Sequence, residues 1–290
     1  MTVRFKKIQC VLIVIMVANI AVALIKLVMG LMCGSNSLVA DGIHSFSDCG
    51  GNIAGLIGIW LSSKPIDEKH PYGYEKFEIL TSLFIGVMLV VMSVEIFLSA
   101  VASLKQGEEL YFGLIEFVLM TATVFVNIIV SALEIRFGEK LKSPVLIADS
   151  IHTKSDVFVS IAVIAGLLGI KLGLPEWFDG VISMGVAIVI FISAWEIIRD
   201  NVDVLADCAM VDCDDVRKAL SDVPGIYNIH KIRSHGGETR MFIDLHIIAN
   251  PDENVSYGHK LSHDIEKILK ERYGEGTLVF VHIEPDDGKH

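Results

Sequence analysis

Two short segments of the chain carry histidine and aspartate at the same spacing. The first runs from Ala40 to Asp48 and the second from Ala148 to Asp156, and both follow the pattern A-D-x-I-H-x-x-S-D. In each segment the histidine and the second aspartate are four residues apart, so in a helix both side chains lie on one face. Two imidazoles and two carboxylates together form a tetrahedral nitrogen and oxygen donor set, which suits zinc. The predicted ligands are His44, Asp48, His152 and Asp156.

The same residues have a simpler interpretation as polar contacts between helices. Ionisable groups inside a membrane helix cost a few kcal/mol each and usually mark a pathway or a site. Recurrence of the whole motif therefore favours a metal site. Asp41 and Asp149 lie one turn before the histidines. Each could orient a ligand, relay protons or form a hydrogen bond between two helices, and the sequence leaves these alternatives open.

The segments that must position the motifs are long and apolar. The chain has 290 residues, is 52% hydrophobic and has a mean hydropathy of +0.57, which is too apolar for an ordinary soluble domain. A spanning helix needs about 20 apolar residues. Six stretches qualify, namely Ile8–Met32, Ser37–Leu61, Phe77–Leu104, Tyr111–Phe137, Pro144–Leu168 and Pro175–Ile198. The first is long and contains Lys26, so we interpret it as a span and not as a signal peptide.

Basic residues alternate between the two sides of these six spans. They gather in the amino-terminal tail and in the loops after spans two and four, as Arg4, Lys6 and Lys7, then Lys64, Lys69 and Lys76, then Arg136, Lys140 and Lys142. The other connections contain only Lys105 and Lys171. By the positive-inside rule, both termini are cytoplasmic in this integral, multi-pass membrane protein. The second and fifth spans then run in opposite directions, as in an inverted repeat.

Residues 205–290 form a second predicted domain, after a transmembrane domain of residues 1–204. This segment has sixteen acidic and ten basic residues, and its acidic character argues against nucleic acid as a partner. Helices over 212–221 and 254–272, with strands over 228–234, 240–249 and 278–284, predict a small α+β fold with its helices on one face. The five cysteines form no Cys-x-x-Cys pair, which is consistent with a reduced cytoplasmic domain.

Nearly the whole chain resembles the cation diffusion facilitator family. The resemblance rests on the six spans, the paired H-x-x-x-D motifs, the loop from Asp67 to Lys76, and the closing His282-Ile-Glu284-Pro. It implies a homodimeric exchanger of divalent metal ions for protons, with its transport site on the second and fifth spans and a ferredoxin-like cytoplasmic domain. Regulatory zinc ligands in that domain are implied at His230, His246, His259, His282 and Glu284. The family also implies an interlock near the dimer hinge between Lys76 and Asp207.

The loop between the second and third spans departs from the family pattern. Asp67 and His70 are candidate ligands, but Tyr74 stands where many family members have a third ligand, a histidine. A neutral phenol is a poor zinc ligand. The loop therefore either binds metal weakly or is an ordinary polar loop.

The signature motifs of two other classes of protein are absent from this sequence. A zinc hydrolase of the H-E-x-x-H type and an ATP-driven pump with a G-x-x-x-x-G-K-[ST] loop are both excluded by the sequence. We expect a transporter and not an enzyme, which uses no ATP and sits in membrane lipid. Its expected function is to export a divalent transition metal, zinc first, from the cytoplasm in exchange for protons. The alternatives are an iron(II), cadmium, cobalt or manganese transporter of the same type, or a membrane-bound metal sensor without transport.

Overall fold

A computed structural model describes residues 3–33, 36–106, 114–171, 175, 177–237 and 239–286. Inside these ranges the structure does not describe the side chains of residues 33, 36–38, 40, 41, 44, 47, 48, 103–106, 114–116, 167, 170, 171 and 179. The chain divides into two compact units, Met1–Asn201 and Val202–His290, which we describe separately.

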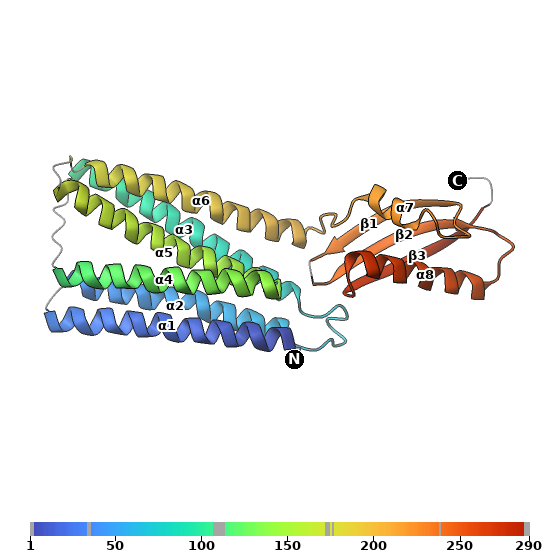
Figure 1. Ribbon diagram of the computed structural model, residues 1–290, viewed down its shortest axis with the longest axis horizontal. Coiled ribbons are helices and arrows are strands. Elements are labelled where there is room, and N and C mark those ends of the chain that lie inside the picture. The colour runs from blue at the N-terminus through green and yellow to red at the C-terminus, as the bar shows by residue number, and fades with distance from the viewer. Residues whose placement is uncertain are drawn as a thin grey trace. The chain divides into compact units, whose positions relative to one another are not determined.

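The first unit consists of long helices (Figure 1). They are α1 (Val3–Cys33), α2 (Asn36–Ser62), α3 (Lys76–Gln106), α4 (Leu114–Leu141), α5 (Pro144–Lys171) and α6 (Trp177–Leu205). Even the 27 residues of α2, at 1.5 Å per residue, exceed the roughly 30 Å hydrocarbon core of a bilayer. All six predicted spans are confirmed as helices. Most extend past the predicted ends, because polar and charged residues outside an apolar stretch can continue the helix.

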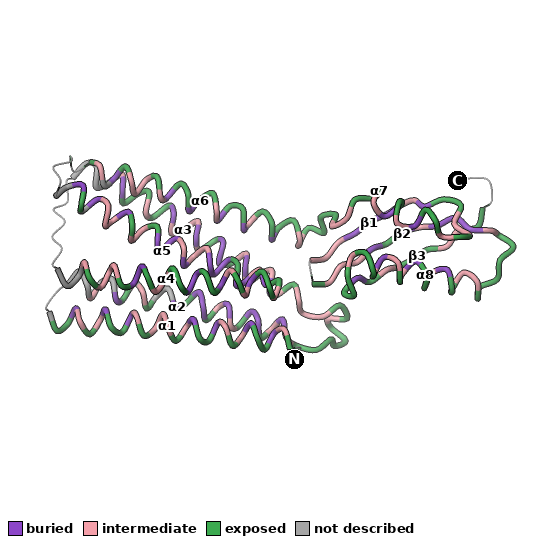
Figure 2. Tube along the Cα trace, in the orientation of Figure 1, coloured by how far each residue is buried: buried purple, intermediate pink, exposed green. Residues whose placement is uncertain are grey.

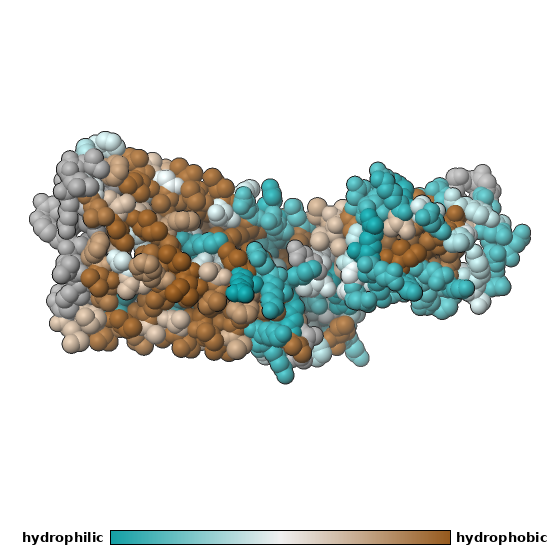
Figure 3. Space-filling model, in the orientation of Figure 1, coloured by the Kyte–Doolittle hydropathy of each residue, from teal (hydrophilic) through white to brown (hydrophobic). Residues whose placement is uncertain are grey.

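The outer surface of this unit is apolar, as the brown face in Figure 3 shows. Within the described residues, four helices meet the length and hydropathy expected of a span: Val3–Met32, Lys76–Ala102, Phe117–Leu141 and Gly180–Leu205. Helix α5 carries charged residues within its length, among them Asp149, Lys154 and Asp156.

The packing of the helices places α2 beside α5. Helix α1 packs on α2, α4 packs on α5, and α3 contacts both α2 and α5. A Cβ atom at Gly55 of α2 would lie 3.3 Å from Val145 Cγ1 of α5, so these two helices meet directly. The unit has an apolar core, whose fully buried side chains include Ile8, Leu12, Ile59, Leu89, Leu146 and Ile190. Buried positions along the helices are purple in Figure 2.

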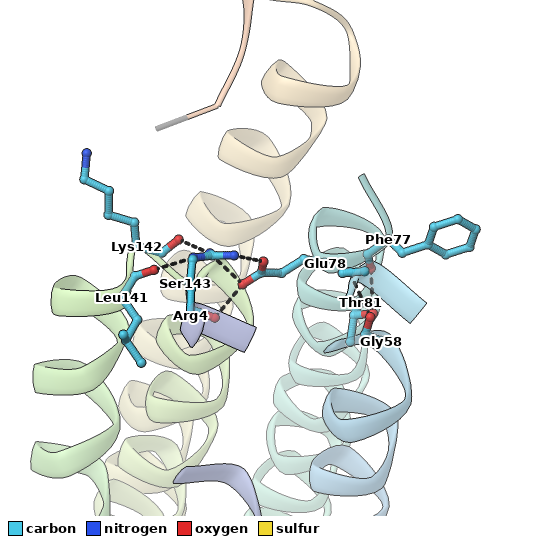
Figure 4. Close-up of polar contacts among 9 residues, drawn as sticks. Arg4, Gly58, Phe77, Glu78, Thr81, Leu141, Lys142 and Ser143 are labelled. Atoms are coloured by element: carbon cyan, nitrogen blue, oxygen red, sulfur yellow. Dashed lines mark hydrogen bonds and ion pairs between the residues drawn. The ribbon is translucent and has the colours of Figure 1, made fainter. Parts of the chain in front are cut away.

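One end of the helical unit is fastened by Arg4 of α1 (Figure 4). Its Nη1 and Nη2 donate to the carboxylate of Glu78 on α3, at 2.9 and 3.2 Å. Its Nε and Nη2 also donate to the carbonyl oxygens of Leu141 and Lys142, both at 2.7 Å. The Ser143 hydroxyl donates to Glu78 at 2.6 Å. Arg4 thereby connects α1, α3 and the α4–α5 turn.

The second unit contains α7 (Cys213–Leu220), β1 (Asn228–Gly236), β2 (Met241–Ala249), α8 (Val255–Tyr273) and β3 (Thr277–Pro285). The sheet order is β1-β2-β3, with β1 antiparallel and β3 parallel to the central β2. This α-β-β-α-β order is the ferredoxin-like arrangement without its first strand. The predicted α+β fold is therefore confirmed, and each element lies within two residues of its predicted bounds.

Both helices of the second unit cover one face of the sheet. Along β2 the side chains alternate, and Ile243, Leu245 and Ile247 point into the core, where they meet Leu261 and Ile265 of α8. Val216 and Leu220 of α7 join the same core. By this alternation, His246 faces the opposite, uncovered side of the sheet.

Candidate metal sites

The second repeat of the motif lies on α5, where His152 and Asp156 are half-buried one turn apart. Thr153 and Ser155 beside them are buried and bond to backbone carbonyls of their own helix. The first repeat lies on α2, but the side chains of His44 and Asp48 are outside the described residues. The structure thus places both motifs on adjacent helices.

A buried lysine lies beside the first repeat. Lys26 of α1 is 7% exposed, and its Nζ donates to Ser45 Oγ of α2 at 3.0 Å. The two helices are very close here, because a Cβ atom at Gly42 would lie 2.8 Å from the backbone nitrogen of Leu27. The sequence interpretation used Lys26 only as evidence against a signal peptide. A lysine inside an apolar stretch was the sequence signal that could have marked Lys26 as a buried polar residue near the site.

The motif region contains a second acidic group that sequence reasoning missed. Glu134 of α4 is fully buried and interacts with the carboxyl group of Asp149 on α5, which is 2% exposed. An acidic residue within the predicted span Tyr111–Phe137 was the available signal. The pairing itself could not be predicted, because it depends on how α4 packs on α5.

Histidines from all three strands line up across the uncovered face of the second sheet. His230 of β1 is the register partner of His246 of β2, which in turn is the partner of His282 of β3. Glu284 Oε1 lies 2.8 Å from His246 Nδ1, and Glu284 Oε2 lies 3.1 Å from His230 Nε2. His282 Nε2 is 3.7 Å from the same carboxylate. Three of these residues, His230, His246 and Glu284, each offer one ligand atom, and these atoms lie within 4.8 Å of one another.

The electrostatics of this cluster favour an ionised Glu284. The hydrogen bond with His246 is the main cause that lowers the pKa of Glu284 below its ordinary value, and Lys231 and His230 lower it further.

His259, also predicted as a ligand, lies away from this cluster. It stacks edge-on against His263 on α8, with ring centroids 4.5 Å apart. Helix α8 covers the other face of the sheet, so within one chain His259 does not join the cluster.

The loop between α2 and α3 is closed by its own hydrogen bonds. Tyr74 Oη donates to Asp67 Oδ2 at 2.6 Å, and the backbone nitrogen of His70 donates to Asp67 Oδ1 at 2.7 Å. The tyrosine bond is the main cause that lowers the pKa of Asp67, and the same contact raises the pKa of Tyr74. The rings of His70 and Tyr74 are 4.0 Å apart. Tyr74 thus closes the loop through its hydrogen bond to Asp67.

The two residues of the predicted interlock belong to different units. Lys76 is the first residue of α3, and Asp207 follows α6 with a left-handed φ of 57°. The interlock stays a prediction.

A bundle of membrane-spanning helices with a repeated histidine and aspartate motif, followed by an α+β unit with a histidine and carboxylate cluster, is typical of a membrane transporter of metal ions. Residues 12–206 match the model of the cation efflux transmembrane domain, and residues 209–286 match that of the cation efflux protein cytoplasmic domain. The chain therefore belongs to the cation diffusion facilitator family. It is a metal cation efflux transporter and not an enzyme.

Similar proteins span nearly the whole chain. An uncharacterised transporter of Methanocaldococcus jannaschii is 36% identical over 282 residues, which cover 94% of this chain and 96% of the relative. The manganese efflux system protein MneS of Bacillus subtilis is 27% identical, over 94% of this chain and 93% of the relative. The manganese efflux system protein MneP of the same organism is 28% identical, over 93% of each.

Proposed function

We propose that this protein exports a divalent transition-metal ion from the cytoplasm in exchange for protons, through a site made by His44, Asp48, His152 and Asp156. The observation that carries the proposal is the repetition of one nine-residue motif on α2 and α5, two helices that contact each other. A metal sensor without transport would leave an ionisable motif on two membrane helices unexplained.

The direction of transport rests on the charges at the helix ends. The distribution of Lys and Arg favours a cytoplasmic location for both termini. Expelling a doubly charged ion against an inside-negative potential of 100 mV costs about 4.6 kcal/mol, while each entering proton returns about 2.3 kcal/mol. Imidazole and carboxylate ligands must lose protons to bind metal. Alternate loading of one site by metal and protons therefore couples the two gradients.

Two metals are the leading candidates for the cargo. The two imidazoles and two carboxylates favour zinc, which takes four ligands at about 2.0–2.2 Å. Manganese is the second candidate, because the names of two relatives state manganese efflux. Iron(II), cobalt and cadmium are further members of the same class of cargo.

The carboxy-terminal cluster is proposed as a regulatory zinc site. Its ligands are His230, His246 and Glu284, with His282 as the nearest further donor. Tetrahedral ligands at about 2.0 Å from zinc lie about 3.3 Å from one another. The distances of 2.8 and 3.1 Å between Glu284 and the two histidines are close to that spacing. Zinc would cross-link β1, β2 and β3 and so stabilise the unit by mass action.

We further propose that the protein is a homodimer joined through the carboxy-terminal unit, with Lys76 and Asp207 as the interlock near the hinge. In the loop, the hydrogen bonds of Asp67 with Tyr74 and with the His70 backbone favour a structural role over metal binding.

Metal flux into reconstituted vesicles with an imposed pH gradient tests the transport site. We expect His152→Ala and Asp156→Ala each to reduce proton-coupled zinc and manganese flux to the level of empty vesicles, with the protein still folded. Glu196→Gln, which removes an exposed carboxylate from α6, should transport normally. Normal flux in either motif variant would contradict the assignment.

A further inference from the structure

Glu134 and Asp149 place two carboxyl groups side by side in the interior of the helical unit. Glu134 is 0% exposed and Asp149 is 2% exposed. They come from different helices, α4 and α5. Each charge costs a few kcal/mol in the membrane, and two neighbouring carboxylates repel each other. A pair of this kind is stable only when a proton or a metal ion neutralises it.

The surroundings of the pair are polar but do not neutralise it. Glu134 interacts with the Thr153 hydroxyl and the Asp149 carboxyl. Both interactions are looser than an ordinary hydrogen bond, and neither carboxyl oxygen of Glu134 has a hydrogen-bond partner within the described part of the chain. The same is true of Asp149 Oδ2. Three buried oxygen atoms are thus available for a ligand.

The charges around the pair are mainly acidic. The charged groups that act on Glu134 are Asp149 and Asp156, both carboxylates. The basic group that acts on Asp149 is His152, a predicted ligand of the transported metal. His152 binds metal only in its neutral form, so it is not a permanent counter-ion of the carboxyl pair.

The packing of α4 on α5 holds the two carboxyl groups together. One turn before Glu134, the Ser131 hydroxyl donates to the carbonyl oxygen of Ser150 at 3.1 Å, which ties the helices at this level. One turn after it, a Cβ atom at Gly138 would lie 3.0 Å from Ile147 Cγ1, so glycine permits the close approach. The two carboxyl groups therefore lie between two close contacts of α4 with α5.

We propose that Glu134 and Asp149 form an oxygen-donor site for a divalent metal ion, between the α4–α5 turn and the transport site. This site deepens the proposed transport function and rests on it. Asp149 precedes His152 by three residues, about 4.5 Å along the helix axis. A metal ion that enters from the side of the α4–α5 turn meets the carboxylate pair first and the deeper histidine and aspartate ligands second.

The donors define the class of ion. The two oxygens of Glu134 and Asp149 Oδ2 are hard ligands, and Thr153 Oγ1 adds a fourth oxygen. That hydroxyl donates to the Asp149 carbonyl oxygen at 3.2 Å and keeps lone pairs with which to accept or coordinate. Oxygen ligands suit manganese better than zinc, which favours nitrogen and sulfur. The carboxylate pair would therefore concentrate manganese next to the transport site.

Manganese binding to the purified full-length protein tests the site, with free Mn²⁺ measured by electron paramagnetic resonance. The background protein carries His152→Ala and His246→Ala, which disable the transport site and the carboxy-terminal cluster. We expect this background to keep a saturable Mn²⁺ site in the membrane unit. Glu134→Gln and Asp149→Asn should each remove that site, because each replaces one carboxylate by a neutral amide of the same shape.

Matched controls are available on other membrane helices. Glu95→Gln on α3 and Glu196→Gln on α6 remove exposed carboxylates and should leave the bound Mn²⁺ unchanged. Unaltered binding in the Glu134→Gln protein, or no saturable site in the background protein, would overturn the proposal. If Glu134→Gln changes only the uptake of protons, the pair binds protons and the metal site is likewise overturned. If no metal flux is found in vesicles, the proposed transport function is wrong, but the Mn²⁺ binding measured for the Glu134 and Asp149 variants still stands.

Discussion

The guanidinium group of Arg4 and the carboxylate of Glu78 form a bidentate ion pair that joins the start of α1 to the start of α3 (Figure 4). The side chain of Glu78 is 4% exposed and that of Arg4 is 21% exposed. The pair is therefore largely buried, and Arg4 uses its remaining donors on Leu141 and Lys142. No other residue type can make this set of bonds, because only arginine has a planar fork of five donors.

We predict that Arg4→Met destabilises the helical unit by about 3–5 kcal/mol, since it leaves the buried Glu78 carboxylate without its ion-pair partner. The double variant Arg4→Met/Glu78→Gln should recover part of the loss. Thermal unfolding in detergent measures both. Arg199→Met is the control, because the Arg199–Asp200 pair is about two-thirds exposed and such pairs contribute about 0–1 kcal/mol. Equal effects of Arg4→Met and Arg199→Met would contradict a structural role for the ion pair.

The Arg4–Glu78 ion pair is a feature of the fold that the sequence does not predict, whereas the helices that carry it are predicted. Hydropathy over about 20 residues defines each span by itself, so α1 to α6 were predicted correctly. Strand alternation likewise predicted that His282 and Glu284 share one face. Arg4 and Glu78 are 74 positions apart, and nothing in their local sequence connects them. Contacts of this kind depend on helix packing.

His259 illustrates the same limit at the carboxy-terminal site. Its sequence position, four residues before His263, predicts a shared helix face correctly. Which side of the sheet that helix covers depends on the burial of Leu261, Ile265 and Leu269. The structure places this helix opposite His246. Sequence reasoning had no access to that choice, so it grouped histidines that the fold separates.

The choice of metal should respond to His44. We predict that His44→Asp, which changes two nitrogens and two oxygens to one and three, raises the ratio of manganese to zinc flux severalfold. Both fluxes are measured in one vesicle preparation at fixed pH. His70→Asp in the α2–α3 loop is the control and should leave the ratio unchanged. A constant ratio in the His44→Asp protein would mean that His44 is not a ligand.

The carboxy-terminal cluster makes a prediction that separates its histidines. We expect Glu284→Gln and His230→Ala each to weaken zinc binding by the purified protein, because each removes a donor from the group of three. The loss should reach about tenfold or more, which corresponds to about 1.4 kcal/mol. Calorimetry with micromolar zinc measures it.

His259→Ala is the matched control for this cluster, since it removes an exposed histidine from the other face of the same sheet. Zinc affinity should stay at the parental value. A large loss in His259→Ala would show that the site uses a ligand from α8, which one chain alone does not provide.

The last prediction concerns acid stability and Asp215 in α7. Its carboxylate accepts hydrogen bonds from Arg272 Nε at 2.8 Å and from Tyr273 Oη at 2.6 Å, and these bonds tie α7 to the end of α8. The bonds with Arg272 and then Tyr273 lower the pKa of Asp215 to about 2. Because the folded pKa is below the ordinary value of 3.8, the ionised carboxylate stabilises the folded unit. That stabilisation is complete above about pH 4 and is lost as the pH falls toward 2.

Thermal unfolding of the segment 205–290, which has its own hydrophobic core, measures this dependence between pH 2 and pH 7. We expect Asp215→Asn to lower the melting temperature by several degrees at pH 6, and the difference from the parent segment to shrink as the pH approaches 2. Asp214→Asn, whose partner Arg217 is exposed, should have a much smaller effect at every pH. The difference in melting temperature between Asp215→Asn and the parent segment could instead be the same at pH 2 and pH 6. In that case the hydrogen bonds with Arg272 and Tyr273 would not stabilise the ionised carboxylate, and the contribution of Asp215 to stability would have another origin.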